Sequence, residues 1–248
     1  MTTRFEQVGF SQRVQLDWMR YAADLVAAGN ASAEIEEALQ DLLSDKLSVG
    51  GKAERGNREK AITIILKTWV RPPPEVEALR DDGLTLLRGL PNSERVAVHW
   101  GLAMAVYPFW GAVAETTGRL LRLQGAAAAA QVQRRMKEQM GQRETVARAA
   151  RRVLRSFHDW GVLAEEGTKG IYVGKAPIRI NGPRLTAWLM EAYLLSRKEG
   201  RATPKGIVDS PAFFPFAIES CTASVAAGNP RLEVARHGLD EDLISLSS

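Results

Sequence analysis

The segment from Glu144 to Trp160 constrains the fold of this chain more than any other. Taken as a helix that turns ~100° per residue, it gathers apolar side chains on one face, namely Val146, Ala149, Ala150, Val153, Leu154, Phe157 and Trp160. The opposite face carries Arg148, Arg151, Arg152 and Arg155, spread over about 100° of the helix. A helix that needed only solubility would mix charges of both signs and gain ion pairs between successive turns. The like-charge repulsion on this face therefore favours an anionic partner outside the chain.

Positive charge is concentrated around this helix. Residues 131–155 hold eight Lys or Arg side chains against two Glu side chains, which gives a net charge of +6. The whole chain of 248 residues has a net charge of only +4, so the other 223 residues sum to −2. Arginine binds phosphate groups with better geometry than lysine does. The pattern indicates a polyanionic partner, and double-stranded DNA is the leading candidate.

The segments on either side of this helix complete the layout of a winged helix-turn-helix. Residues 129–140 are predicted to form the preceding helix, and Gly141-Gln142 makes a tight turn between the two. Residues 162–165 and 170–173 are short apolar or β-branched runs that predict a hairpin, which would serve as the wing. The chain is thus predicted to be mainly α with a small β wing, a helical N-terminal domain being followed by a winged helix-turn-helix.

Candidate DNA-binding residues follow from that layout. In such units the second helix enters the major groove, and its first residues lie nearest the base edges. Candidates for base contacts are therefore Gln142, Arg143 and Thr145. The arginines of the helix face and Lys169 at the hairpin are expected to meet phosphates, which set affinity more than sequence preference. The basic side chains of the preceding helix complete the set, and they are Arg134, Arg135 and Lys137.

The rest of the chain is predicted to be mostly helical. Apolar periodicity and proline or glycine boundaries predict helices over 10–28, 32–47, 58–70, 74–87, 94–106, 109–124 and 185–195. The alanine run 126–130 is expected to favour helix, because alanine is the strongest helix former. Short strands are predicted over 177–180, 232–235 and 243–246. The expected domains are 1–125 (all-helical), 126–182 (winged helix-turn-helix) and 183–248 (mixed α/β).

The residues that support catalysis or metal binding in other proteins form no pattern in this sequence. Cys221 is the single cysteine, so no intrachain disulfide is possible, which fits a reducing, cytoplasmic location. His99, His158 and His237 are far apart and make no zinc pattern. Met1–Gln7 has no apolar run, so no signal peptide is expected. We expect a protein without enzymatic activity, cofactor or metal.

Residues 96–114 raise the question of a membrane, because they include no Asp, Glu, Lys or Arg. A spanning helix needs roughly 20 apolar residues. However, Pro108 lies inside this stretch, Gly101 and Gly111 interrupt it, and His99 is ionisable. A buried core helix that breaks near Pro108 is the preferred interpretation, with a membrane-spanning helix as the alternative.

Two segments resemble a known family. The sequences HWGLAMAVYPFWGAVAETTGRLLRLQG (His99–Gly125) and RRMKEQMGQRETVARAARRVLRSFHDWGVL (Arg134–Leu163) are similar to the BrxA-type proteins of bacterial BREX phage-defence islands. The resemblance covers about Phe10 to Ile180. It implies a small, largely helical, non-enzymatic protein with winged-helix character that binds DNA. It also implies a role in a system that distinguishes or restricts phage DNA, with other defence-system proteins as possible partners.

Two other functions stay open from the sequence. A winged-helix transcriptional regulator would act as a dimer on a palindromic site, with half-sites one helical turn apart. A protein–protein adaptor in a multi-subunit complex would direct the basic helix face at an acidic partner. An enzyme is the least favoured, because no nucleophile, base and orienting partner are recognisable together.

Overall fold

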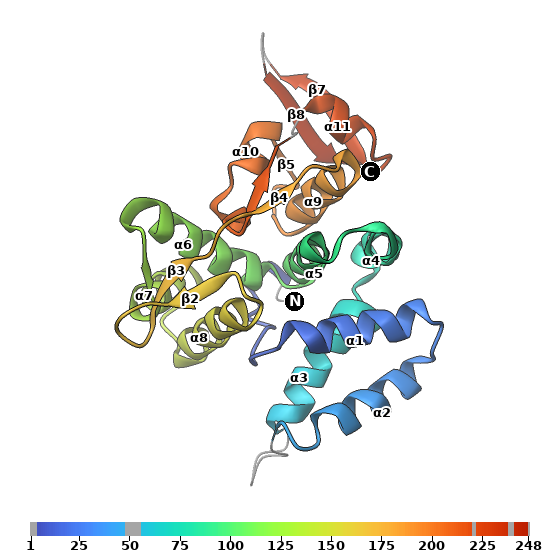
Figure 1. The fold of residues 1–248 in the computed structure, drawn as a ribbon. Coiled ribbons are helices and arrows are strands. Elements are labelled where there is room, and N and C mark those ends of the chain that lie inside the picture. The colour runs from blue at the N-terminus through green and yellow to red at the C-terminus, as the bar shows by residue number, and fades with distance from the viewer. Residues whose placement is uncertain (1–3, 48–55, 220–221, 238–240, 248) are drawn as a thin grey trace.

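The fold is built mainly from helices (Figure 1). A computed structural model describes residues 4–47, 56–219, 222–237 and 241–247. Helices account for 62% of the structure and the sheets are small, which confirms the mainly α class. The longer helices are α1 (Leu16–Ala27), α2 (Ser32–Leu43), α3 (Asn57–Ile65), α4 (Pro74–Gly89), α5 (Asn92–Val106), α6 (Pro108–Gln124), α7 (Ala129–Met140), α8 (Glu144–Asp159) and α9 (Pro183–Leu195). The shorter ones are η1 (Arg4–Glu6), the π-helical η2 (Leu66–Val70), α10 (Pro204–Val208), η3 (Pro211–Phe213) and α11 (Ala223–Ala227).

The strands form three small sheets within the described residues. In the first, β1 (Ala127–Ala128), β3 (Ile171–Gly174) and β2 (Leu163–Glu165) pair antiparallel in the order β1-β3-β2. In the second, β4 (Ile178–Ile180) pairs parallel with β6 (Phe216–Ile218). In the third, β5 (Arg201–Ala202), β8 (Glu241–Leu246) and β7 (Leu232–His237) pair antiparallel in the order β5-β8-β7. Figure 1 shows this third sheet at the top of the view, with α7, α8 and the β2–β3 hairpin at the left and α2 and α3 at the bottom.

Most of the predicted elements are confirmed, but the first helix begins later than predicted. It starts at Leu16 rather than Phe10. The backbone of Val14 is hydrogen-bonded to α8 instead: its N–H donates to Ser156 Oγ at 3.0 Å, and its carbonyl accepts from Trp160 Nε1 at 3.0 Å. The segment before α1 therefore forms hydrogen bonds with Ser156 and Trp160 instead of the backbone hydrogen bonds of a helix. A prediction from periodicity alone does not detect such an exchange.

The alanine run at 126–130 is the second correction. Gly125 ends α6 in the left-handed region, with φ of 73°, where glycine is favoured. Ala127 and Ala128 then form β1 against Tyr172 and Ile171 of β3, and α7 begins only at Ala129. Pairing with a strand distant in sequence therefore overrides the helix propensity of alanine.

Aromatic side chains dominate the centre of the core. The ring of Phe157 in α8 lies 4.7 Å from Trp100 of α5 and 4.7 Å from Trp110 of α6. Trp160, just beyond α8, lies 4.7 Å from Trp110. Buried side chains from residues 1–125, 126–182 and 183–248 all join one hydrophobic cluster. The division of the chain into three domains at these boundaries stays a prediction.

Helices α5 and α6 form the apolar stretch for which the sequence left two interpretations. All residues of Val96–Val106 are buried, and α5 ends next to Pro108, which confirms the predicted core helix. In the described part of the chain no single helix has the length and apolar character needed to cross a membrane. Helices α5 and α6 meet that requirement only jointly, as a pair bent by 117°.

Truncation of Phe157 should test how strongly α8 depends on the aromatic cluster. Phe157 is fully buried, and Phe157→Ala removes its contacts with both tryptophans. We expect the free energy of unfolding, measured by guanidinium denaturation, to fall by about 3–5 kcal/mol. Leu123 is 81% exposed, so Leu123→Ala should change it by less than about 0.5 kcal/mol. Equal losses in the two variants would contradict this account of the core.

Acid should destabilise the fold through His99. Burial, and then repulsion from Arg20 and Arg95, lowers the pKa of His99 from 6.5 to about 3. As the pH falls below 6.5 the unfolded chain binds a proton at this side chain, whereas the folded chain does not until about pH 3. The free energy of unfolding should therefore decrease with falling pH across this window, by up to about 1.4 kcal/mol per pH unit.

The contribution of His99 can be isolated with two variants. Urea denaturation at pH steps across the window should give a shallower slope for His99→Leu than for the unmodified protein. Leu123 is exposed and carries no titratable group, so Leu123→Ala provides the control and should keep the original slope. An unchanged slope in His99→Leu would assign the acid sensitivity to other groups.

Candidate nucleic-acid interface

The orientation of α8 is set by its apolar face. Six of the seven residues predicted to face inward lie within α8, and each is at most 2% exposed. On the other side Arg148, Arg151 and Arg155 are exposed and Arg152 is half-buried. The predicted segregation of apolar and basic side chains is thus confirmed.

The basic face of α8 is offset only weakly by the described part of the chain, where Glu144 attracts Arg148 one turn along the helix. Among the described residues, Arg148, Arg151, Arg152 and Arg155 form no ion pair with a carboxylate. Arg152 donates a hydrogen bond to the backbone carbonyl of Ser11 instead. Burial lowers the pKa of Arg152, and repulsion from Arg148 and Arg151 adds to the effect. The face therefore carries excess positive charge that an external anion can offset.

The candidate residues of α7 are more nearly neutralised. Arg134 lies 3.7 Å from Glu138, one turn along the same helix. Lys137 Nζ donates to Glu144 Oε1 at 2.8 Å, and this contact lowers the pKa of Glu144. Within the described ranges only Arg135 of this group is left without a carboxylate, and it is exposed. Helix α7 thus contributes less free positive charge than its sequence indicates.

The turn between α7 and α8 places the three candidates for base contacts on the surface. Gly141 makes the turn with φ of 99°, in the region that favours glycine. Gln142, Arg143 and Thr145 are all exposed. The guanidinium of Arg143 folds back and donates to the carbonyl of Met140 at 3.1 Å, at the end of α7. Gln142 and Thr145 therefore remain the more available of the three for an external contact.

The hairpin is present as predicted, but its tip is close to neutral. Strands β2 and β3 pair in register from Leu163↔Gly174 to Glu165↔Tyr172. Lys169 is exposed in the connecting turn, which follows Glu165 and Glu166 in the sequence. Glu165 accepts a hydrogen bond from the N–H of Gly170 at 3.1 Å, and Glu166 is exposed beside it. Lys169 therefore adds little net positive charge to the candidate interface.

A cavity of about 320 Å³ beside α8 reveals basic residues that the sequence analysis missed. Arg151, Arg152 and Arg155 of α8 line it together with Arg13 and Lys46 from the N-terminal part of the chain. More than 100 positions in sequence separate the two groups. No spacing or motif connects Arg13 or Lys46 to α8, so only the tertiary structure identifies them.

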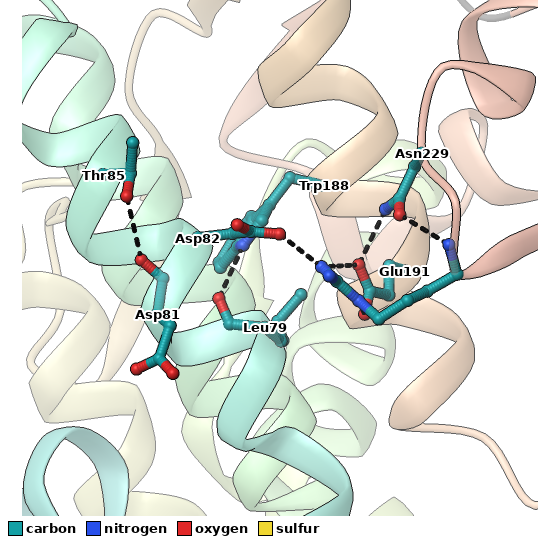
Figure 2. Close-up of polar contacts among 8 residues, drawn as sticks. Leu79, Asp81, Asp82, Thr85, Trp188, Glu191 and Asn229 are labelled. Carbon is teal, nitrogen blue, oxygen red and sulfur yellow. Dashed lines mark hydrogen bonds and ion pairs between the residues drawn. The ribbon is translucent and has the colours of Figure 1, made fainter.

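A contrasting charge cluster lies between α4, α9 and the segment before β7. Figure 2 shows Asp82 of α4 and Glu191 of α9 directed toward a common centre, with Asn229 beside Glu191. That centre is the guanidinium of Arg231, which donates to Glu191 at 2.6 and 2.9 Å and to Asp82 at 2.5 Å. Asn229 donates to Glu191 at 2.7 Å. These contacts raise the pKa of Arg231, the bond to Glu191 contributing most.

The two clusters use arginine differently. At Arg231 one cation meets two carboxylates, and the side chain of Glu191 is only 3% exposed. Such a group is already satisfied inside the protein and holds elements together. On α8, four cations have no carboxylate partner in the described structure. The α8 face, and not the Arg231 cluster, is therefore the candidate site for an external anion.

Comparisons with protein-family models, curated proteins and solved structures find no match for this chain. The interpretation of the interface therefore depends on the chemistry of its own residues.

Removal of Arg231 should be costly because it leaves Glu191 buried without its cation. We expect Arg231→Met to lower the free energy of unfolding by about 3–5 kcal/mol in urea denaturation. Replacement of both partners, Arg231→Met with Glu191→Leu, should restore much of the loss, because no buried charge remains unpaired. The exposed pair Arg179–Glu219 is the control, and Arg179→Met should cost less than about 1 kcal/mol. Similar losses in the two single variants would contradict this role.

Proposed function

We propose that this protein is a non-enzymatic double-stranded DNA-binding protein. The observation that carries the proposal is the face of α8, where four arginines lie opposite a buried apolar face and lack carboxylate partners in the described structure. Phosphate groups along duplex DNA supply closely spaced negative charge that matches such a face. Arginine binds these groups through two parallel N–H donors.

We propose further that α7, α8 and the β2–β3 hairpin act as a winged helix-turn-helix. The order α6, β1, α7, α8, β2, β3 supports this, as does the antiparallel pairing of β1 with β3 beside β2. In such a unit α8 enters the major groove. Gln142 and Thr145 would then lie nearest the base edges, and Arg148 with the other arginines on the exposed part of α8 would contact phosphates on either side. Affinity should depend strongly on salt and weakly on sequence.

We also propose that this binding serves a bacterial phage-defence system of the BREX kind, alongside other defence-system proteins. This part depends on the resemblance of His99–Gly125 and Arg134–Leu163 to BrxA-type proteins. It adds a biological context to duplex binding, and duplex binding does not depend on it.

The test of duplex binding uses two arginines on neighbouring helices. Fluorescence anisotropy with a random-sequence duplex across a salt series should show binding that weakens steeply with salt. In the variant Arg135→Gln/Arg148→Gln, two phosphate contacts are lost, so the slope of log K against log salt should decrease by about 2. Both side chains are exposed, so the fold should tolerate the changes.

The control removes the same charge from a sheet that lies away from α7 and α8. Arg201 and Arg236 are exposed on β5 and β7, far from α8 in Figure 1. Arg201→Gln/Arg236→Gln should leave the salt slope close to that of the unmodified protein. Absence of duplex binding at low salt, or equal losses in both double variants, would refute the proposal. Affinity for an acidic protein without affinity for DNA would favour an adaptor instead.

A further inference from the structure

The cavity beside α8 is formed by segments that are distant in sequence. Its walls come from α8, from the segment that precedes α1, from the start of α1, from the residues that follow α2 and from the start of α3. Its volume of about 320 Å³ lies at the lower end of the range for small-molecule sites. Trp18 and Leu47 add an apolar part to a wall that is otherwise polar. The space therefore suits a ligand of nucleotide size better than a bare ion.

The charge of this cavity has one sign. Among the described residues, five cationic side chains line it, namely Arg13, Lys46, Arg151, Arg152 and Arg155, and none of the described lining residues is Asp or Glu. One of the five is neutralised from outside the lining, because Arg13 donates to both carboxylate oxygens of Asp159. The other four have no carboxylate partner among the described residues. A ligand that carries more than one negative charge would offset this excess best.

Hydrogen bonds hold the walls in place around the cavity. Arg152 donates to the carbonyl of Ser11, which ties α8 to the segment before α1. Gln12 is 6% exposed, and its Oε1 accepts from the N–H of Arg13 at 3.1 Å while its Nε2 donates to the carbonyl of Asn57 at 3.4 Å. The same segment is therefore tied to α3 as well. Fixed donors lose little conformational entropy when a ligand binds.

We propose that this cavity binds a terminal phosphate monoester, carried by a nucleotide or by the 5′ end of a nucleic acid strand. A phosphate monoester carries about −1.5 to −2 charges at neutral pH, whereas each phosphodiester of a duplex carries one. A terminal phosphate also protrudes from its parent molecule and can enter a recess. The phosphodiesters of a duplex lie on a broad convex cylinder, so they fit the exposed part of α8 and not this cavity.

Phosphate binding in the cavity and duplex binding on α8 can be tested separately. Lys46 lies in the cavity but outside the α7–β3 unit, whereas Arg148 lies on α8 but does not line the cavity. Lys46→Gln therefore affects the cavity alone, and Arg135→Gln/Arg148→Gln affects the duplex surface alone. Lys46 is exposed, so its replacement should leave the fold intact, as the thermal midpoint without ligand will verify.

The experiment is isothermal titration calorimetry of the full chain with adenosine monophosphate, inorganic phosphate and adenosine. Adenosine monophosphate should bind, inorganic phosphate should bind more weakly, and adenosine should not bind. Loss of one charge-assisted hydrogen bond in Lys46→Gln should weaken adenosine monophosphate binding about tenfold. Lys205 is exposed on α10, and Lys205→Gln should bind like the unmodified protein.

Two oligonucleotides assign the source of the phosphate. A single-stranded oligonucleotide with a 5′-phosphate is compared with the same strand carrying a 5′-hydroxyl, in the unmodified protein and in Lys46→Gln. A preference for the phosphorylated strand that disappears in Lys46→Gln supports a strand end as the ligand. Nucleotide binding without that preference supports a free nucleotide. Adenosine binding equal to that of its monophosphate, or full monophosphate binding by Lys46→Gln, would overturn the inference, whatever the outcome for duplex DNA.

Discussion

The burial of α8 against the aromatic cluster is the interaction on which the rest of the structure depends. Phe157 and Trp160 fix the rotation of this helix about its axis, because both rings pack against Trp110. That rotation directs the arginines away from the core. Repulsion between like charges one turn apart costs a few tenths of a kcal/mol per pair, whereas burial of one phenylalanine contributes several kcal/mol. The apolar face therefore determines the position of the helix, and the basic face is displayed as a result.

The contrast between Arg231 and the α8 arginines separates structural charge from available charge. Arg231 contacts Glu191 and Asp82, so its charge is used to join α4, α9 and the segment before β7. Net charge and isoelectric point do not distinguish the two situations, because they count both kinds of arginine equally. The structure distinguishes them by the presence or absence of a carboxylate within contact distance. By this criterion Arg134 and Lys137 are weaker candidates for anion binding than the sequence indicates, because each contacts a carboxylate.

Local patterns predicted the middle of the sequence well, because the relevant information lies within a few turns of chain. The bounds of α7, the turn at Gly141 and the β2–β3 hairpin all follow from periodicity and turn residues. The failures share one cause, which is pairing across long sequence separations. Strand β1 forms because β3 is available, and the segment at Val14 is extended because Ser156 and Trp160 bond its backbone. The contribution of Arg13 and Lys46 to a cavity beside α8 was unpredictable for the same reason.

The basic face of α8 belongs to two proposed anion sites at once. Arg151, Arg152 and Arg155 line the cavity and also lie on the helix proposed to contact duplex DNA. A dianion in the cavity offsets charge that the duplex would otherwise meet, so the two ligands should weaken each other's binding. Thermodynamic linkage requires the factor to be the same in both directions. Arg148 lies outside the cavity, so its contact with DNA would be affected least. The sharing of one helix face thus gives the proposed DNA-binding protein a physical route to respond to a small phosphorylated ligand.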